Sequence, residues 1–413
     1  MKFFSIDNII TTIFIILFLM FLPIFFGIDF LNTVQNTVQD LKITDMVFSQ
    51  IRDQKNEQKD TNIVIVNIGY LNRAQVAEQL NIINSYSPKV IGIDVMYFSE
   101  KTPEMDLPLA DALSKIKNLV MVGKLESKSD TSETFDDLLL PAEKFRQNAK
   151  IGYANFILAP EEFQTIRAFS PKEKYKNTLQ LAFSLQIAKI FNSKAVEDFL
   201  NRDNETEIIN FRRNIDKYTI LDVDDVFLKK DSLQFIKDKI VLFGFLGKTV
   251  NTKMNEDIFY TPMNPQYLGK AYPDMYGIVV HANAITMILH KDQINALPDI
   301  LRLSIIGLLA YFIMALFSFM RIKLGEWYES LSLLVLLIVM AFVLFVILYS
   351  FYRFNYLMEI KEVFLVFMIA EMVSESYHGS IKPLSIEGFK KVKNKYFRKK
   401  ISGDEIQTPK ILE

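Results

Sequence analysis

The sequence predicts an α/β domain with a mixed, largely parallel sheet and helices on both faces, together with four transmembrane helices. Apolar runs near both ends of the 413-residue chain are long enough to cross a bilayer. Between them, short apolar segments alternate with amphipathic ones, the pattern of strands and helices in parallel α/β folds. Residues 29–298 are numerous enough to bury one substantial core.

Four segments are predicted to span the membrane: residues 9–28, 299–320, 330–351 and 356–373. The first has no charged residue and no small-residue cleavage site after it, so we interpret it as an uncleaved anchor rather than a signal peptide. The second and third are almost free of charge. The fourth is more polar, and we favour a spanning helix over one lying in the interface.

The fourth span carries Glu359, Lys361, Glu362 and Glu371 inside it or at its rims. A charge exposed to lipid is costly, so these side chains either lie among the headgroups or face another membrane protein. Both interpretations stay open. They make Glu359, Glu362 and Glu371 candidate contacts with a partner or with the membrane.

Basic residues set the expected orientation. Arg321 and Lys323 lie between the second and third spans, and the tail 374–413 is rich in Lys and Arg. Because basic loops stay in the cytoplasm, we expect residues 1–8 and the tail to be cytoplasmic. Residues 29–298 then lie outside, in the periplasm if this is a bacterial inner-membrane protein.

Composition argues against several function classes. The chain has no cysteine and three histidines, so we expect neither a metal site nor a cofactor. Residues 244–249 resemble a phosphate loop, but Leu242 stands where its first glycine belongs. A net charge of −1 gives no indication of nucleic acid as a partner. No nucleophile–base set is visible, so we expect no catalytic residue and no enzyme.

The first half of the outer segment predicts a βαβ unit. A helical stripe covers residues 30–52, and residues 62–69 form an apolar strand. Asn72 is a suitable cap for the next helix, which ends at Ser87-Pro88. Residues 90–95 are the second strand. A helix over 106–116 and a strand over 119–123 follow.

The second half is less regular. We expect residues 151–156 and 165–169 to pair as strands, and residues 179–191 to form an amphipathic helix. Residues 208–211 and 218–221 are expected as short strands, 226–235 as a helix, and 239–244 as a return to the sheet.

Several motifs together resemble a known family. They are Thr-Asp at 44–45, the strand 90–95 continuing to Glu100, Gly-Tyr-Ala-Asn at 152–155, the strand 239–244 followed by Asp257 and Thr261-Pro262, and Gly-Ile-Val-Val-His-Ala-Asn at 277–283. Over residues 40–372 the chain resembles the CHASE-two family, the second type of CHASE extracellular sensory domain. The family also has one span before the domain and three after it.

The resemblance implies a sensory protein, and two functions remain open. In the family, this arrangement usually delivers a signal to a cytoplasmic catalytic domain. Only about 40 residues follow the last span here, so we expect the output to lie in another membrane protein or protein complex. The alternative is a structural or scaffolding subunit of an envelope complex. It is favoured by Asn67, where relatives usually have Asp, and by the degraded motif at 161–167.

Three acidic residues are candidates for binding a small extracytoplasmic ligand. Asp94 ends a buried strand, where open α/β sheets place ligands, and Asp106 and Asp257 lie in loops that can share that edge. The alternative is that Asp94 caps a turn. His281 and Asn283 are placed at a strand-to-helix junction, where His281 is expected to be structural and Asn283 to cap the helix.

Overall fold

Residues from distant parts of the sequence combine into two units. The computed structural model describes residues 6–17, 45–52, 54–126, 134–158, 164–250, 256–264, 272–358 and 361–384. The α/β domain consists of Asn36–Asn295 and Phe351–Tyr356, and the helical unit of Met1–Gln35, Ala296–Ser350 and Leu357–Glu413. Residues 351–356 therefore belong to the α/β domain, although helices of the other unit flank them in sequence.

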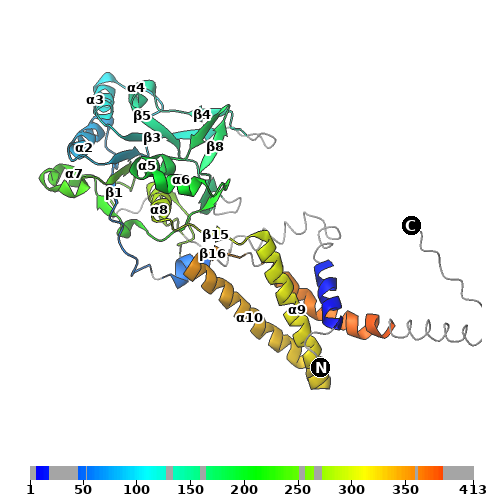
Figure 1. Cartoon of the computed structure of the whole chain (residues 1–413). Coiled ribbons are helices and arrows are strands. Elements are labelled where there is room, and N and C mark those ends of the chain that lie inside the picture. The colour runs from blue at the N-terminus through cyan, green and yellow to red at the C-terminus, as the bar shows by residue number, and fades with distance from the viewer. Residues whose placement is uncertain are drawn as a thin grey trace, which may run out of the picture. The chain divides into compact units, whose positions relative to one another are not determined.

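Parallel strands form the main sheet of the α/β domain, in the order β11-β1-β12-β2-β3-β5 (Figure 1). β4 pairs antiparallel with the second half of β3. The strands are β1 (Ile63–Asn67), β2 (Val90–Ile93), β3 (Leu119–Glu126), β4 (Asp137–Leu139), β5 (Ala149–Tyr153), β11 (Thr219–Leu221) and β12 (Ile240–Gly244). The mixed, largely parallel sheet is confirmed.

Helices cover both faces of this sheet. Helices α2 (Arg73–Ser85), α3 (Pro103–Ser114) and the short α7 (Asp225–Leu228) share one apolar cluster with Val64, Val66, Ile91 and Phe243 of the strands. On the opposite face, α5 (Phe183–Phe191) packs on Gly92 and α8 (Gly277–His290) packs on Gly244. Burial on both faces explains why β1, β2 and β12 are continuous apolar runs rather than alternating ones.

Local signals correctly predict the βαβ unit. Asn72 caps α2 in a capping box: its side chain accepts a hydrogen bond from the Gln75 N–H, and the Gln75 side chain accepts one from Asn72. The strands predicted at 62–69, 90–95, 119–123 and 239–244 are all present. β12 lies between β1 and β2, so the most distant of these strands in sequence occupies the centre of the sheet.

Helix α8 is buried along almost its whole length. It begins where Ile278 packs against Gly244, the last residue of β12, at about 2.7 Å from where a Cβ would lie. It ends beyond Thr286, whose hydroxyl donates to Asp60 just before β1. α8 therefore runs antiparallel to the strands, from the carboxyl edge of the sheet to its amino edge.

Three local predictions in the second half of the domain are wrong. β5 does not pair with β7 (Ile166–Phe169). It joins β3, and β7 pairs with β6 (Ile157–Leu158) and β10 (Glu207–Ile208). Residues 179–191 are a helix only from Phe183, because Thr178–Leu181 is strand β9, in a hairpin with β8 (Lys172–Tyr175). Residues 226–235 form α7 and 3-10 turns at Lys230–Ser232 and Gln234–Ile236.

The remaining elements are short. They are the π-helical turn Val47–Ile51, α4 (Glu143–Arg146), α6 (Ser193–Leu200), the 3-10 turn Ile215–Lys217, the hairpin β13 (Ile258–Phe259) with β14 (Met275–Tyr276), and the pair β15 (Asn295–Ala296) with β16 (Tyr356–Leu357). Of the helix predicted over 30–52, residues 45–51 are helical and residues 30–44 lie outside the described residues.

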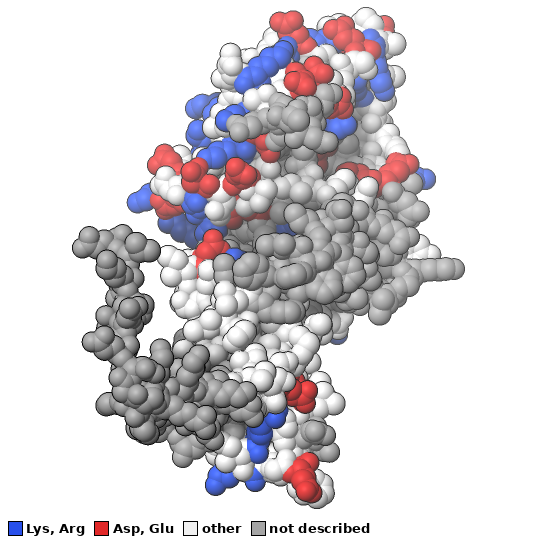
Figure 2. All heavy atoms as spheres, turned by 90° about the vertical axis from the view of Figure 1, so that its right-hand side faces the viewer, with Lys and Arg blue, Asp and Glu red and all other residues white. Residues whose placement is uncertain are grey.

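The helical unit contains the helix Ile6–Leu17, α9 (Asp299–Leu324), α10 (Tyr328–Phe354) and α11 (Lys361–Ser376), with a 3-10 turn at Gly325–Trp327 and a π-helical turn at Tyr377–Ile381. Ile15, Phe317, Ile347 and Phe367 belong to the apolar cluster these helices share. Ser318 Oγ donates to Asn8 Oδ1 at 2.8 Å. Figure 2 shows charged side chains spread over the α/β domain, whereas the described surface of the helical unit is mostly uncharged.

Four spans were predicted, but only two described helices are long and apolar enough to cross a membrane, at Asp299–Trp327 and Leu331–Phe354. Of the span predicted at 9–28, residues 18–28 lie outside the described residues. The span predicted at 356–373 is wrong in its bounds, because Tyr356–Leu357 is a strand and α11 begins at Lys361. At 16 residues, α11 is shorter than the roughly 20 residues that cross a bilayer upright.

Candidate functional site

The carboxyl edge of the sheet holds Asn67, at the end of β1, and Asp94, just after β2. Asn67 is fully buried and fully hydrogen-bonded. Its side-chain oxygen accepts from the N–H groups of Gly69 at 3.0 Å and Leu246 at 2.9 Å. Its amide donates to Asp222 Oδ1 at 2.8 Å and to the Gly247 carbonyl at 3.1 Å. Asn67 therefore fixes three loops at this edge.

Asp94 and Asp257 approach each other at the same edge. Burial, and secondly the negative charge of Asp257, raise the pKa of Asp94 to about 8. The Asp257 backbone is in a left-handed conformation, with φ 52°, and its carbonyl accepts the Gly277 N–H at 3.0 Å. Asp257 thus lies beside Gly277, the first residue of α8. Ligand binding by Asp94 and Asp257 stays a prediction.

Asp106, the third predicted ligand residue, is engaged elsewhere. It is fully buried, and its carboxylate contacts Arg73 at 2.5 Å, Lys144 at 2.8 Å and the Lys101 N–H at 2.7 Å. Although burial alone would raise its pKa, the hydrogen bonds from Lys144 and Arg73 hold the pKa of Asp106 well below its usual range. Asp106 therefore anchors α3 to α2 and is not available to a ligand.

His281 and Asn283 lie inside α8 and not at a strand-to-helix junction, because the helix already begins at Gly277. His281 is buried between two aromatic rings, with centroid distances of 4.4 Å to Phe156 and 5.1 Å to Phe183. Its Nδ1 has no hydrogen-bond partner among the described residues. Burial lowers the pKa of His281 to about 3, so the ring is neutral and acts as a core side chain.

Asn283 fastens α8 to the segment after β10 rather than capping the helix. Its Oδ1 accepts from the N–H groups of Arg212 at 3.2 Å and Arg213 at 3.1 Å, and its Nδ2 donates to the Arg213 carbonyl at 2.8 Å. The amide thereby satisfies backbone groups of a segment without regular secondary structure. This contact positions two arginine side chains next to α8.

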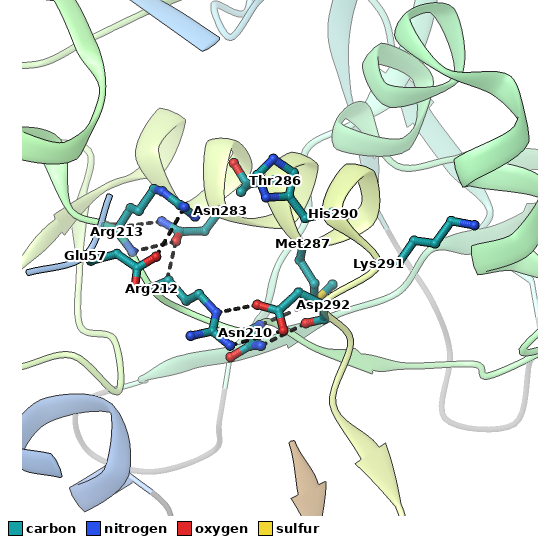
Figure 3. A pocket seen from close by; sticks show the side chains of 10 residues that line it. All are labelled: Glu57, Asn210, Arg212, Arg213, Asn283, Thr286, Met287, His290, Lys291 and Asp292. Carbon is teal, nitrogen blue, oxygen red and sulfur yellow. Dashed lines mark hydrogen bonds and ion pairs between the residues drawn. The ribbon is translucent and has the colours of Figure 1, made fainter. Parts of the chain in front are cut away.

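A cavity of about 240 Å³ lies beside the second half of α8 (Figure 3). Asn283, Thr286, Met287, His290, Lys291 and Asp292 line one side, and Glu57, Asn210, Arg212 and Arg213 line the other. Since Glu57 shortly precedes β1, this is the amino edge of the sheet. The cavity is therefore at the opposite end of α8 from Asp94 and Asp257. Sequence reasoning missed it.

Ion pairs hold the charged groups of this cavity. Arg212 donates from Nε and Nη2 to the two carboxylate oxygens of Asp292. Arg213 pairs with Glu57 at 3.2 Å and donates to the Gln58 carbonyl at 2.9 Å. Burial opposes the charged form of Arg212, but the hydrogen bonds that it donates to Asp292 and the negative charges of Asp292 and Glu57 together raise the arginine pKa. Arg212 is therefore charged.

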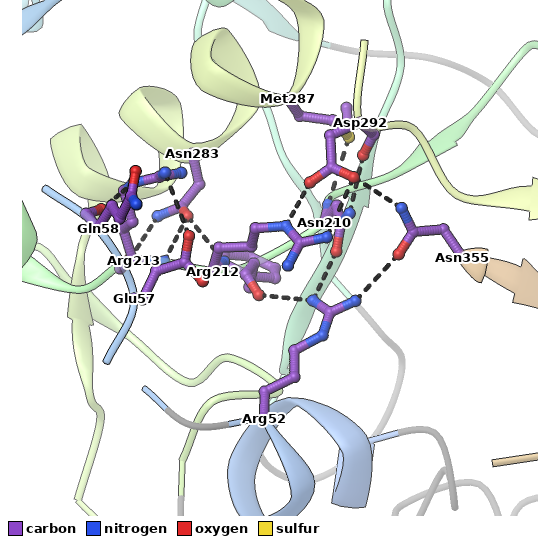
Figure 4. Close-up of polar contacts among 11 residues, drawn as sticks. Arg52, Glu57, Gln58, Asn210, Arg212, Arg213, Asn283, Met287, Asp292 and Asn355 are labelled. Carbon is purple, nitrogen blue, oxygen red and sulfur yellow. Dashed lines mark hydrogen bonds and ion pairs between the residues drawn. The ribbon is translucent and has the colours of Figure 1, made fainter. Parts of the chain in front are cut away.

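Arg52 contacts Asn210 of the cavity lining and is held mainly by neutral groups (Figure 4). Its guanidinium donates to Asn210 Oδ1 at 2.6 Å, the Phe211 carbonyl at 3.0 Å and Asn355 Oδ1 at 3.3 Å. The ring of Phe48 lies 4.6 Å from it. Burial, and secondly the positive charge of Arg212, lower the pKa of Arg52 to about 10. Arg52 forms no ion pair with a described carboxylate.

Asn355 connects this network to the segment between α10 and α11. Its Nδ2 donates to Asp292 Oδ1 at 2.7 Å, and its backbone carbonyl accepts the Asn295 N–H at 2.8 Å. Asn355 has a φ of 54°, a left-handed conformation that Asn tolerates better than most residues. One carboxylate, that of Asp292, thus contacts both the cavity arginine and the interhelix segment.

The sequence matches the family described as CHASE2 domain over residues 12–320. The chain belongs to the CHASE2 domain family. No curated protein and no solved structure matches it. The matched range ends within α9, so α10 and α11 lie outside it, whereas the resemblance noted from sequence extended to residue 372.

Two CHASE2 motif segments meet in the structure. Asp45, from the Thr-Asp motif, forms a buried ion pair with Arg167, from the degraded motif before β7, at 2.8 Å. The pair attaches the segment that enters the domain to β7. The sequence signal for this pair was Arg167, which the chain retains at the end of that motif.

Of the three residues predicted to contact a partner or the membrane, only Glu371 has a described side chain. It lies on α11 and accepts a hydrogen bond from Ser332 of α10 at 2.6 Å, within the helical unit. Glu359 and the Glu362 side chain lie outside the described residues. Among described residues, no group of three or more His, Asp or Glu side chains is arranged to hold a metal ion.

Proposed function

We propose that this CHASE2 protein is a non-catalytic sensor of the bacterial inner membrane. Its α/β domain lies in the periplasm, detects a small ligand and relays the signal to a separate membrane protein or complex. The family membership supports the sensory part of this proposal. The membrane location rests on the long apolar helices, and the orientation rests on the basic residues. The relay rests on the contacts between the cavity and the segment that joins α10 to α11.

The two long apolar helices support the membrane location. They extend over 29 and 24 residues, enough to cross a bilayer. Large apolar side chains on α10, such as Ile338, Phe342 and Phe345, are about 60% exposed. Exposed apolar surface of this kind is favourable in lipid and costly in water. Arg321 and Lys323 at the end of α9 favour a cytoplasmic turn and hence an outer α/β domain.

One observation carries the relay: Asp292 binds Arg212 in the cavity and Asn355 between α10 and α11. A ligand that moves the Asp292 carboxylate changes the contacts of Asn355. Because Asn355 directly follows the last residue of α10, a shift there reaches this long apolar helix through the chain itself. A relay of this kind needs differential contacts in two states, and this carboxylate supplies them.

A functional test uses Asn355→Gly, which keeps the left-handed backbone conformation and removes the side chain. We expect the variant to fold and to co-purify with its partner in mild detergent, but to lose the ligand-dependent response of the complex. The matched control is Asn118→Gly, whose side chain makes an exposed hydrogen bond remote from the cavity. A normal response in Asn355→Gly would contradict the relay.

The alternative function is a structural subunit of an envelope complex. It is favoured by the carboxyl edge of the sheet, where Asn67 fixes three loops and leaves no free acid at its position. Identification of co-purifying chains separates the two proposals. A kinase or cyclase among them supports the relay, whereas an export or wall-assembly complex whose assembly is ligand-independent supports the structural role.

A further inference from the structure

We propose that the cavity beside α8 binds a small carboxylate of net charge −1, whose carboxylate replaces that of Asp292 on Arg212. This inference deepens the proposed sensory function and rests on it for the biological role of the ligand. The binding event itself does not depend on the relay. The argument uses the lining, the charge balance, the size of the cavity and the geometry of one ion pair.

The lining selects a polar ligand. Met287 is the one apolar side chain among the ten residues that line the cavity. Its sulfur is already engaged, because it accepts the Asn210 N–H. Pockets for apolar ligands are lined mainly by hydrophobic and aromatic side chains, so this cavity suits a ligand that is bound through charge and hydrogen bonds.

The charge balance selects an anion. Arg212, Arg213 and Lys291 face Glu57 and Asp292, which leaves one excess positive charge in the lining. Lys291 also pairs with Asp198 outside the cavity, at 2.6 Å. If Lys291 is therefore left out, the lining itself is neutral. Arg52, which contacts the lining residue Asn210, then adds one positive charge, because its described partners are neutral oxygens and aromatic rings. Either count leaves one positive charge for a ligand to neutralise.

The volume selects a small ligand. About 240 Å³ corresponds to the space of roughly eight water molecules at about 30 Å³ each. A molecule with about ten or fewer non-hydrogen atoms fits, in the size range of amino acids and short hydroxy acids. A nucleotide or an oligosaccharide does not.

The Arg212–Asp292 pair selects a carboxylate. Two N–H groups of Arg212 meet the two oxygens of Asp292, the fork geometry in which a guanidinium binds a carboxylate. Asp292 thus occupies the position that a ligand carboxylate would take, as an internal competitor. The ligand competes with Asp292 for Arg212. Because Asn355 also donates to Asp292, displacement of this carboxylate changes a contact of the interhelix segment.

The experiment measures binding to the full-length protein in detergent, by calorimetry and thermal shift. The probes are glutamate, aspartate, lactate and acetate, with glutamine as the neutral analogue of glutamate and inorganic phosphate as the non-carboxylate anion. We expect at least one of the carboxylates to bind, and phosphate and glutamine to bind at least about tenfold more weakly.

Two variants separate binding from folding. Asp292→Asn removes the internal competitor while it keeps the side-chain shape, so we expect carboxylates to bind about tenfold more tightly. Arg212→Gln is expected to weaken binding by about tenfold or more. Lys172→Gln, which breaks a surface ion pair away from the cavity, is the control. A gain of affinity in Asp292→Asn cannot result from misfolding.

Absence of binding by every carboxylate to both the natural protein and Asp292→Asn would overturn the proposal. Equal binding of phosphate and carboxylates would overturn the choice of ligand class. Neither result requires a partner protein. If carboxylates bind but no partner protein is found, the binding proposal stands and the relay fails. If no carboxylate binds and the complex assembles independently of ligand, both proposals are refuted.

Discussion

At the scale of single residues, buried amides do much of the work that charged groups do in many sensory sites. Asn67, Asn210 and Asn283 are each buried and each contact two or more segments. An amide both donates and accepts, so it satisfies backbone N–H and C=O groups at once, which a carboxylate cannot do. Asn67 therefore has a structural role at the carboxyl edge of the sheet.

The first prediction concerns Asn67→Asp. The change removes two donated hydrogen bonds and places a second carboxylate beside Asp222, 2.8 Å from the present amide nitrogen. We expect a loss of about 2–3 kcal/mol in the free energy of unfolding at pH 7, and a smaller loss near pH 4, where one carboxylate protonates. Chemical denaturation at both pH values measures it. Asn118→Asp, at a half-buried position whose one hydrogen bond is exposed, should have a smaller effect, less than about 1 kcal/mol.

The second prediction concerns His281 and pH. Its pKa is about 3 in the folded protein and near 6.5 when unfolded, so the unfolded state binds its proton first. Its contribution to stability is complete above pH 6.5 and is lost as the pH falls toward 3, at up to about 1.4 kcal/mol per pH unit. His281→Gln should flatten the acid side of the stability curve.

The difference between the two stability curves isolates this residue. Asp94 acts with the opposite sign, because its raised pKa makes its contribution largest at low pH and lost as the pH rises toward 8. That contribution is present in both proteins and cancels in the difference. Parallel curves between pH 3 and 6.5 would show that folding does not lower the pKa of His281.

At the scale of elements, the sequence predicted the helices and strands whose formation depends on interactions between nearby residues. The Asn72 cap and the apolar runs of β1, β2 and β12 were readable because capping and burial act within a few residues. Which strand pairs with which could not be predicted from the sequence. β5 joins β3 because Gly152 lets the backbone of Phe183 approach, at 2.5 Å from where a Cβ would lie. That contact depends on α5, which no local pattern near Gly152 specifies.

The segment 45–52 is attached to the domain at both ends, by Asp45 to Arg167 and by Arg52 to Asn210 and Asn355. The third prediction is that Asp45→Asn destabilises the α/β domain by about 3 kcal/mol, because it removes the charge of the carboxylate that pairs with the buried Arg167. Thermal unfolding measures it. The double variant Asp45→Asn with Arg167→Gln should recover part of the loss, and an equal loss in both would contradict a direct pair.

At the scale of the whole chain, the cavity joins residues that sequence reasoning had no means to combine. Arg52, Asn210, Asp292 and Asn355 come from four segments, and Arg52 and Asn355 are separated by 303 positions. The predicted acids Asp94 and Asp257 do meet, since both follow strands at the same edge. α8, about 21 Å long at 1.5 Å per residue, links that edge to the cavity. Both ends of one buried helix therefore carry ionisable groups.

The fourth prediction tests the arrangement of the whole chain about a membrane. The chain has no cysteine, so single cysteines report without background. Leu228 of α7, Trp327 between α9 and α10, and Ile6 are each more than 70% exposed. With the α/β domain outside, a membrane-impermeant maleimide should label Leu228→Cys in intact cells, and should label Trp327→Cys and Ile6→Cys only after lysis.

The pattern of labelling separates the number of spans from their orientation. Labelling of Ile6→Cys together with Leu228→Cys in intact cells would mean that the N-terminal segment does not cross, since both sites then lie on one side. Labelling of Trp327→Cys instead of Leu228→Cys would invert the orientation that Arg321 and Lys323 favour. In that case the cavity would face the cytoplasm, and its ligand would be a cytoplasmic carboxylate rather than an external one.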